Sequence, residues 1–299
     1  MKCFLDACTI INLIHIDEDE FLLNKLENII YYIPEEVFNE VKLNVFVKID
    51  ELAKRNEISK TDYQDYKIKI DSYLIRFRQR IISNQTIIDE LGVYYYDSIK
   101  EIISYKKKTN GELISASCAL FYSRKLLSKI LFFTDDFIAK GDFKDFFFYQ
   151  QIGQIKDSID LIVLLYWIET DEDKVKFSDA DLSKYLKNLF VEYFYQLNYF
   201  KTDLNDFLQS IKVQSKNNIL IKTEIAKTLR CINDLNLDEL QKIYKKIEMD
   251  KNYRELLNIF KKYGDIFTLG IDNRKVAKFK EYELYLKSTG IKKLLDLPT

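Results

Sequence analysis

Short apolar runs that alternate with segments of helical periodicity constrain the fold of the first half of this 299-residue chain. The runs cover residues 3–5, 28–33 and 129–133, and aspartates closely follow the first and the third. A run of this length between helical segments is typical of a strand that is buried on both faces of a sheet. Strands that alternate with helices join into a parallel sheet through crossover connections. We therefore predict an α/β fold, with a parallel sheet that is flanked by helices.

The same periodicity predicts the other elements of this half. A fourth strand is expected at residues 146–152, and helices are expected at residues 9–16, 19–27, 35–45 and 157–169. A further helix begins at Glu112 and carries small side chains that would let it pack closely on the sheet. These small residues are Ser115, Ala116, Cys118 and Ala119.

The remainder of the chain has a helical pattern. Residues 46–108 are rich in charge, and we interpret them as a helical insertion in the first domain. After residue 177 the periodic segments are all helical, at about 178–193, 203–213, 219–233, 236–262 and 274–288. We predict a first domain over residues 1–172 and an all-helical C-terminal domain over residues 173–299.

Composition excludes several classes of enzyme. The chain has one histidine, His15, so it has no histidine pair for a transition metal and only this single histidine for use as a general base. The seven glycines form neither GxxxxGK[ST] nor GxGxxG, which argues against phosphate-cradling loops. The four cysteines form no CxxC pair. Any chemistry must therefore rest on carboxylates, which favour hard cations such as Mg²⁺ or Mn²⁺.

The N-terminal stretch and the overall hydropathy favour a cytoplasmic protein. Asp6 interrupts the first apolar stretch, no small-residue cleavage site follows, and we expect no signal peptide. No run of about 18 uncharged apolar residues is present, so we expect no membrane span.

Basic charge is concentrated at the C-terminal end. Residues 201–299 hold 20 Lys and Arg against 14 Asp and Glu, a balance of +6, whereas the whole chain has a net charge of −1. Two interpretations stay open. The lysines either solvate helix faces or form a polyanion-binding surface, for which the candidates are Lys242, Lys245, Lys246, Lys261 and Lys262.

Carboxylates occur where a parallel sheet would bring them together, because ligands bind such sheets at the carboxyl ends of the strands. Asp6 follows the first strand, and Asp135 and Asp136 follow the third. Glu40 lies on the helix after the second strand, and Glu112 opens a later helix. Taken singly, each has an ordinary structural interpretation as a cap, a turn residue or a solvated helix residue. Together they would repel one another unless a divalent cation neutralised them.

Four segments in this order resemble the motifs of the PIN-domain ribonucleases. Residues 4–14 (FLDACTIINLI) resemble the first motif, in which a strand, an aspartate and an apolar helix follow one another. Residues 33–41 (IPEEVFNEV) resemble the second, and residues 112–119 (ELISASCA) resemble the third. Residues 131–137 (LFFTDDF) resemble the last. The resemblance covers about residues 1–170 and implies a PIN-like fold for the first domain.

The resemblance implies a site and a reaction. Asp6, Glu40, Glu112 and Asp136 would act in catalysis and bind Mg²⁺ or Mn²⁺, with Asp135 as a further metal ligand. Water would then cleave an RNA phosphodiester, and Thr134 would orient water or an acid. Two features depart from the family pattern. Glu112 stands where aspartate is commoner, and Cys8 and Thr9 replace the usual polar residue near Asp6.

We therefore expect a metal-dependent endoribonuclease whose helical C-terminal domain selects the target or a partner. PIN-domain proteins include toxins held by an antitoxin, RNA-processing enzymes and antiviral-defence effectors, and the resemblance does not choose among them. The partners that it implies are RNA, an antitoxin or regulatory protein at the C-terminal domain, and a second copy of the chain. The alternative is a catalytically silent PIN-like module that binds proteins, which the departure at Glu112 and the large helical tail favour.

Overall fold

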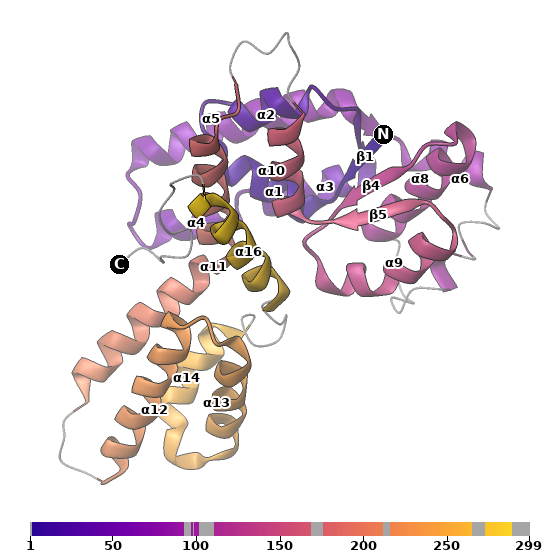
Figure 1. The fold of residues 1–299 in the computed structure, drawn as a ribbon. Coiled ribbons are helices and arrows are strands. Elements are labelled where there is room, and N and C mark those ends of the chain that lie inside the picture. Colours follow the sequence, from indigo (N-terminus) through magenta and orange to yellow (C-terminus); the bar gives the residue numbers. More distant parts are fainter. Residues whose placement is uncertain are drawn as a thin grey trace. The chain divides into compact units, whose positions relative to one another are not determined.

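The chain divides into two compact units, Met1–Ser178 and Asp179–Thr299, which are described separately below (Figure 1). The computed structural model describes residues 2–92, 97, 99–101, 111–168, 176–211, 216–264 and 273–288. The predicted domain boundary between residues 172 and 173 lies outside the described residues.

The first unit contains a five-stranded sheet in which all neighbouring strands are parallel, as the sequence predicts. The strand order is β3-β2-β1-β4-β5, with β1 at the centre. In register, Cys3 of β1 lies beside Tyr31 of β2 and beside Leu131 of β4. The order changes direction between β1 and β4, and such a switch point is where open α/β sheets bind ligands. The strands are β1 (Lys2–Leu5), β2 (Tyr31–Pro34), β3 (Ile81–Ile82), β4 (Ile130–Phe133) and β5 (Gly153–Lys156).

One face of the sheet is covered by α6 (Asn84–Leu91), α8 (Gly111–Leu126) and α9 (Phe137–Tyr149). Their apolar side chains form one buried core with Phe4 of β1 and Phe132 of β4. The small face of α8 lies against β1, β2 and β4, which confirms the predicted close packing. Its four small residues, Ser115, Ala116, Cys118 and Ala119, are fully buried.

The other helices of the first unit, apart from α6, α8 and α9, form a second group. The helix α10 (Ser158–Trp167) packs on α1 (Ala7–Ile16) and on α2 (Phe21–Leu26). The long α5 (Lys60–Phe77) reaches β2 through Phe77, whose ring centroid lies 6.3 Å from that of Tyr31. The remaining two helices are α3 (Glu35–Asn44), which packs on α1 and α8, and α4 (Val47–Lys54), which packs on α5.

The predicted strand at residues 146–152 is wrong, because most of that segment belongs to α9. Ala139, Phe143, Phe146 and Phe147 follow helical spacing and are buried, whereas Phe148 is 73% exposed on the other side of the helix. The strand instead begins at Gly153. A side chain there would bring its Cβ within 1.8 Å of the carbonyl oxygen of Ile130, so the close pairing of β4 and β5 requires glycine.

The interval 46–108 is not wholly helical where the structure describes it. Besides α4, α5, α6 and a short 3₁₀ turn at Arg78–Arg80, it contains β3, which extends the sheet by pairing with β2. A strand of two residues leaves no periodic pattern in a sequence, so this edge of the sheet could not be predicted.

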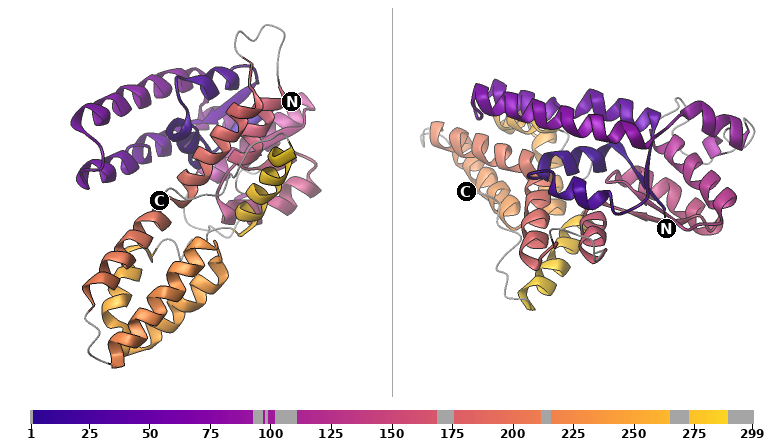
Figure 2. Two further views of the ribbon diagram at one scale, coloured as in Figure 1. Left: turned by 60° about the vertical axis from the view of Figure 1, so that its left-hand side comes forward. Right: turned by 90° about the horizontal axis from the view of Figure 1, so that it is seen from above.

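The regular elements that the structure describes in the second unit, within residues 179–211, 216–264 and 273–288, are all helices (Figure 2). The predicted helix at 203–213 is the end of α11, and the predicted helix at 236–262 is divided by a 3₁₀ turn at Lys251–Tyr253. Large aromatic residues form its core, and the ring centroids of Phe200 and Phe260 lie 4.8 Å apart. The helices are α11 (Asp179–Ser210), α12 (Lys216–Asn233), α13 (Leu237–Met249), α14 (Arg254–Lys262) and α16 (Asn273–Ser288). Among the described residues of the whole chain, no helix is long and apolar enough to cross a membrane.

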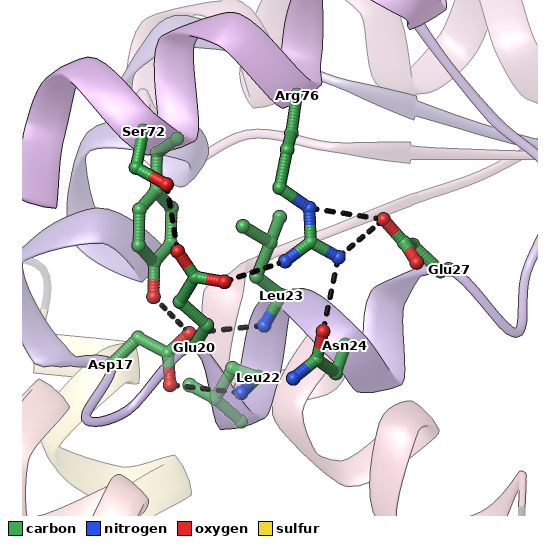
Figure 3. A network of polar contacts seen from close by, with 9 residues as sticks. Asp17, Glu20, Leu22, Leu23, Asn24, Glu27, Ser72 and Arg76 are labelled. Atoms are coloured by element: carbon green, nitrogen blue, oxygen red, sulfur yellow. Dashed lines mark hydrogen bonds and ion pairs between the residues drawn. The ribbon is translucent and has the colours of Figure 1, made fainter.

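A buried carboxylate joins α5 to the start of α2 (Figure 3). Asp17 is 1% exposed and accepts hydrogen bonds from the backbone N–H groups of Leu22 (2.8 Å) and Leu23 (3.0 Å). The hydroxyl of Tyr73 on α5 donates to the same carboxylate. Beside it, Arg76 on α5 donates to Glu20 and Glu27. Desolvation raises the pKa of Asp17. The hydrogen bonds from Tyr73, Leu22 and Leu23 lower it and so offset part of the free energy of burying the charge.

Replacing Tyr73 by phenylalanine should lower the free energy of unfolding by about 1–3 kcal/mol, because it removes a donor from a buried carboxylate. Urea denaturation of the full chain measures this change. The matched control is Tyr66→Phe on the same helix, where the side chain is 39% exposed and the change should stay within about 0.5 kcal/mol. Equal stability of both variants would contradict a structural role for the Asp17 network.

Candidate functional site

The candidate site lies at the switch point, where the loops after β1 and β4 meet. Asp6 directly follows β1, and its backbone N–H donates to the carbonyl of Phe133 at the end of β4 (2.9 Å). Thr134, Asp135 and Asp136 directly follow β4. The pairing of these two central strands therefore brings residues from distant parts of the sequence to one edge of the sheet.

Asp6 is the most buried of the predicted site carboxylates. It occupies the N-cap position of α1 and is 3% exposed. Its Oδ2 accepts hydrogen bonds from Oγ1 of Thr134 (2.7 Å) and from Sγ of Cys8 (3.1 Å). Its Oδ1 is buried and has no hydrogen-bond partner among the described residues. Burial raises the pKa of Asp6, the donors lower it, and the charge of Asp136 raises it further. An unpartnered buried carboxylate oxygen is costly and calls for a cation or a donor.

Glu40 lies on α3 and faces the start of α8. The backbone N–H of Gly111 donates to its Oε1 (3.3 Å). A Cβ on Gly111 would lie 2.8 Å from Oε2 of Glu40 and 3.1 Å from Cγ2 of Val37. Burial raises the pKa of Glu40, as do the charges of Asp6 and Glu36. Gly111, which the sequence analysis did not single out, supplies both a donor and the space that the Glu40 carboxylate occupies.

Glu112 stands in the first turn of α8. Burial raises its pKa to about 7, and the charges of Asp6, Glu40 and Asp136 act in the same direction. Because like charges repel one another most strongly at short distances, these effects indicate that Glu112 lies near the other three carboxylates. The structure thus brings together Asp6, Glu40, Glu112 and Asp136.

The two adjacent aspartates after β4 have different environments. Asp136 caps α9, because its Oδ1 accepts from the backbone N–H of Ala139 (3.0 Å). Asp135 accepts from Nδ2 of Asn12 on α1 (2.8 Å) and from the hydroxyl and backbone N–H of Ser158 at the start of α10. Asp135 therefore links two helices, and the bonds from Asn12 and Ser158, neither of which the sequence singled out, occupy its oxygens.

The residues next to Asp6 are also in place. Sγ of Cys8 accepts a hydrogen bond from the backbone N–H of Asp135 (3.1 Å) and lies 3.6 Å from Oγ1 of Thr134. Burial raises the pKa of the Cys8 thiol, as do the charges of Asp6 and Asp135. Thr9 is fully buried. His15 lies further along α1, with its Nε2 3.0 Å from the carbonyl of Val45, so it joins α1 to the end of α3.

The carboxylates fit a divalent cation, since they offer oxygen ligands and one buried oxygen of Asp6 has no partner among the described residues. In the present arrangement, however, the described residues include no group of three or more His, Cys, Asp or Glu side chains that could hold a metal ion. The carboxylates therefore lie in one region but do not surround a common point. This arrangement is expected for groups that repel one another.

The candidate basic surface of the second unit is largely neutralised. Lys242 pairs with Glu239 (3.2 Å), Lys246 pairs with the buried Glu224, and Lys262 pairs with Asp203. Ion pairs within the unit therefore engage three of the five lysines that the sequence proposed for polyanion binding. This favours the interpretation that these lysines serve the helices themselves.

In comparisons with known proteins, no family model, no curated sequence and no solved structure matches this chain.

The raised pKa of Glu112 makes stability depend on pH. Its ordinary value is 4.5 and its folded value about 7, so the folded chain holds this proton more tightly than the unfolded chain. Its contribution is fully present below about pH 4.5 and is lost as the pH rises to about 7. Glu112→Gln, which mimics the protonated form, should therefore be more stable than the wild type by about 1–3 kcal/mol above pH 7 in EDTA, and similar to it at pH 4.5.

Urea denaturation at these two pH values measures the effect. The control is Glu255→Gln, at an exposed position of α14, which should leave the pH dependence unchanged. If Glu112→Gln were no more stable than the wild type above pH 7, the raised pKa of Glu112 would be contradicted.

Proposed function

We propose that this protein is a metal-dependent endoribonuclease that hydrolyses RNA phosphodiesters, with a PIN-like first domain. Asp6, Glu40, Glu112 and Asp136 would hold Mg²⁺ or Mn²⁺. The observation that carries the proposal is the unpartnered, buried Oδ1 of Asp6 amid carboxylates that raise one another's pKa. The four segments that resemble the PIN-domain motifs all contribute to this cluster.

The chemistry of such a site needs no histidine. When bound, a divalent cation lowers the pKa of a water molecule and offsets charge on the phosphate oxygens. The chain's own residues hold the carboxylates in position. Thr134 donates to Asp6 and also accepts from the backbone N–H of Asp136 (3.1 Å), so one hydroxyl fixes both acids. The Glu112 carboxyl keeps its proton up to about pH 7 and must release it for a cation to bind.

The role of the second unit follows from its composition and packing. Its described helices form their own aromatic core, and several of its lysines are already paired. We therefore propose that it selects a protein partner or a target, and that RNA is held mainly by the first unit near the carboxylates. The salt dependence of RNA binding by the full chain would measure how many phosphates are contacted.

Asp6→Asn should abolish cleavage of mixed cellular RNA in Mn²⁺, with a loss of about a hundredfold or more, because it removes the central carboxylate. EDTA should abolish cleavage by the wild type. Asp71→Asn, at an exposed position of α5, should cleave like the wild type. In EDTA, Asp6→Asn should also melt at a higher temperature than the wild type, since it relieves repulsion.

If no variant cleaves RNA, calorimetric titration with Mn²⁺ decides between two accounts. Binding by the wild type but not by Asp6→Asn would indicate an enzyme that needs a trigger. Absence of binding would contradict the proposed enzyme, and the catalytically silent protein-binding module would then explain the fold. In that case, Asp6→Asn should retain every interaction of the protein.

Gly111→Ala tests the placement of Glu40. The added Cβ would meet Oε2 of Glu40, which is the flexible end of its side chain, so the carboxylate should move while the fold persists. We expect Mn²⁺-dependent cleavage to fall by about 10- to 100-fold. The control is Gly141→Ala in α9, where no described atom lies within 4 Å of the added Cβ, and cleavage should be unchanged. Equal activity of both variants would contradict a role for the Glu40 carboxylate in cleavage.

A further inference from the structure

The thiol of Cys8 is part of the candidate site, because it contacts the Asp6 carboxylate directly. Its Sγ donates to Oδ2 of Asp6 at 3.1 Å, and it accepts from the backbone N–H of Asp135 at the same distance. Cys8 is only partly buried, whereas the carboxylate that it contacts is 3% exposed. The other oxygen of that carboxylate, Oδ1, has no partner among the described residues. A sulfur ligand and an unsatisfied oxygen ligand therefore belong to one pair of adjacent side chains.

The distance between these two side chains suits a shared cation. Metal–sulfur and metal–oxygen bonds to a cation such as Zn²⁺ are about 2.3 Å and 2.0–2.2 Å long, so Sγ of Cys8 and Oδ2 of Asp6, which are 3.1 Å apart, can both reach one ion. The unpartnered Oδ1 belongs to the same carboxylate. The ion would take the place of the thiol proton that now lies between them. The S–H bond breaks, the metal–sulfur bond forms, and the proton passes to the solvent.

We propose that Cys8 is a metal-selecting residue, which makes this site prefer a thiophilic divalent cation, such as Co²⁺, Zn²⁺ or Cd²⁺, over Mg²⁺. The inference rests on the proposed function, since it concerns the same carboxylate site. Soft thiolate ligands favour such cations, whereas Mg²⁺ prefers oxygen ligands alone. The ion binds through Sγ of Cys8 and the Asp6 carboxylate and keeps water at its remaining positions. The nearby charges of Glu112 and Asp136 add to its attraction.

The neighbouring bonds favour this role. The backbone N–H of Asp135 donates to Sγ at 3.1 Å and so fixes the position of the sulfur beside Asp6. Thr134 holds Oδ2 of Asp6 from the other side at 2.7 Å, so the carboxylate keeps its orientation toward the sulfur. The buried Cys118 on α8 forms part of the apolar core instead.

Titration of the full-length wild type with Co²⁺ tests the proposal, because a cobalt–thiolate bond gives a charge-transfer absorption in the near ultraviolet. We expect this band to saturate at one Co²⁺ per chain. Cys8→Ser should lose it and should bind Co²⁺ about tenfold or more weakly, while its Mg²⁺ affinity changes little. Cys231→Ser should keep the band, which makes it the matched control. Circular dichroism of Cys8→Ser, of a second variant, Cys8→Ala, and of the wild type shows whether the variants are folded. Loss of the band in folded variants means that the sulfur ligand itself is missing.

The outcomes separate this inference from the proposed function. A band that persists in Cys8→Ser, or that disappears in Cys231→Ser, would overturn the role of Cys8. Mn²⁺-dependent cleavage without any cobalt–thiolate band would overturn it as well, but would leave the nuclease intact. A band that requires both Cys8 and Asp6, in a protein that cleaves no RNA, would support the metal site and contradict the nuclease.

Discussion

The hydrogen bond from Thr134 to Asp6 is the interaction on which the candidate site depends. It joins residues 128 positions apart, and it forms only because β1 and β4 are neighbours at the centre of the sheet. The same hydroxyl accepts from the backbone of Asp136, and the backbone of Asp6 donates to the end of β4. Two acidic loops are thereby fixed at the switch point. Glu40 and Glu112 reach them from α3 and α8, which pack on each other.

Gathering these acids opposes the stability of the fold. Burial and mutual repulsion raise the pKa values of Asp6, Glu40 and Glu112, so ionising them costs free energy in the folded chain. Only part of this cost is offset by donors, since one oxygen of Asp6 has none among the described residues. The buried Asp17 differs, because both of its oxygens accept hydrogen bonds, from Leu22, Leu23 and Tyr73. The contrast is a physical reason to associate the first cluster with a ligand.

The sequence predicted the central sheet because β1, β2 and β4 are buried at three of their four positions and, apart from Lys2, consist of apolar or aromatic residues and Pro34. The prediction from sequence failed at the two edge strands of the sheet, β3 and β5. The peripheral β5 has the sequence GQIK and β3 has two residues, so neither carries an apolar run. The phenylalanines at 146–148 were mistaken for a strand because a dense aromatic run hides the helical spacing of its buried members.

At the site, residue type and order predicted which acids gather, but not which donors hold them. Asp135 and Asp136 are chemically identical neighbours, and only the packing of α1 and α10 shows that Asn12 and Ser158 engage the first. The space for Glu40 depends on a missing side chain at Gly111, and a sequence read without its fold gives no sign of that dependence. Cys8 departs from the family pattern, yet it donates to the central carboxylate where a polar residue would be expected. A thiol at this position keeps a donor to Asp6 and would offer a cation sulfur in place of oxygen.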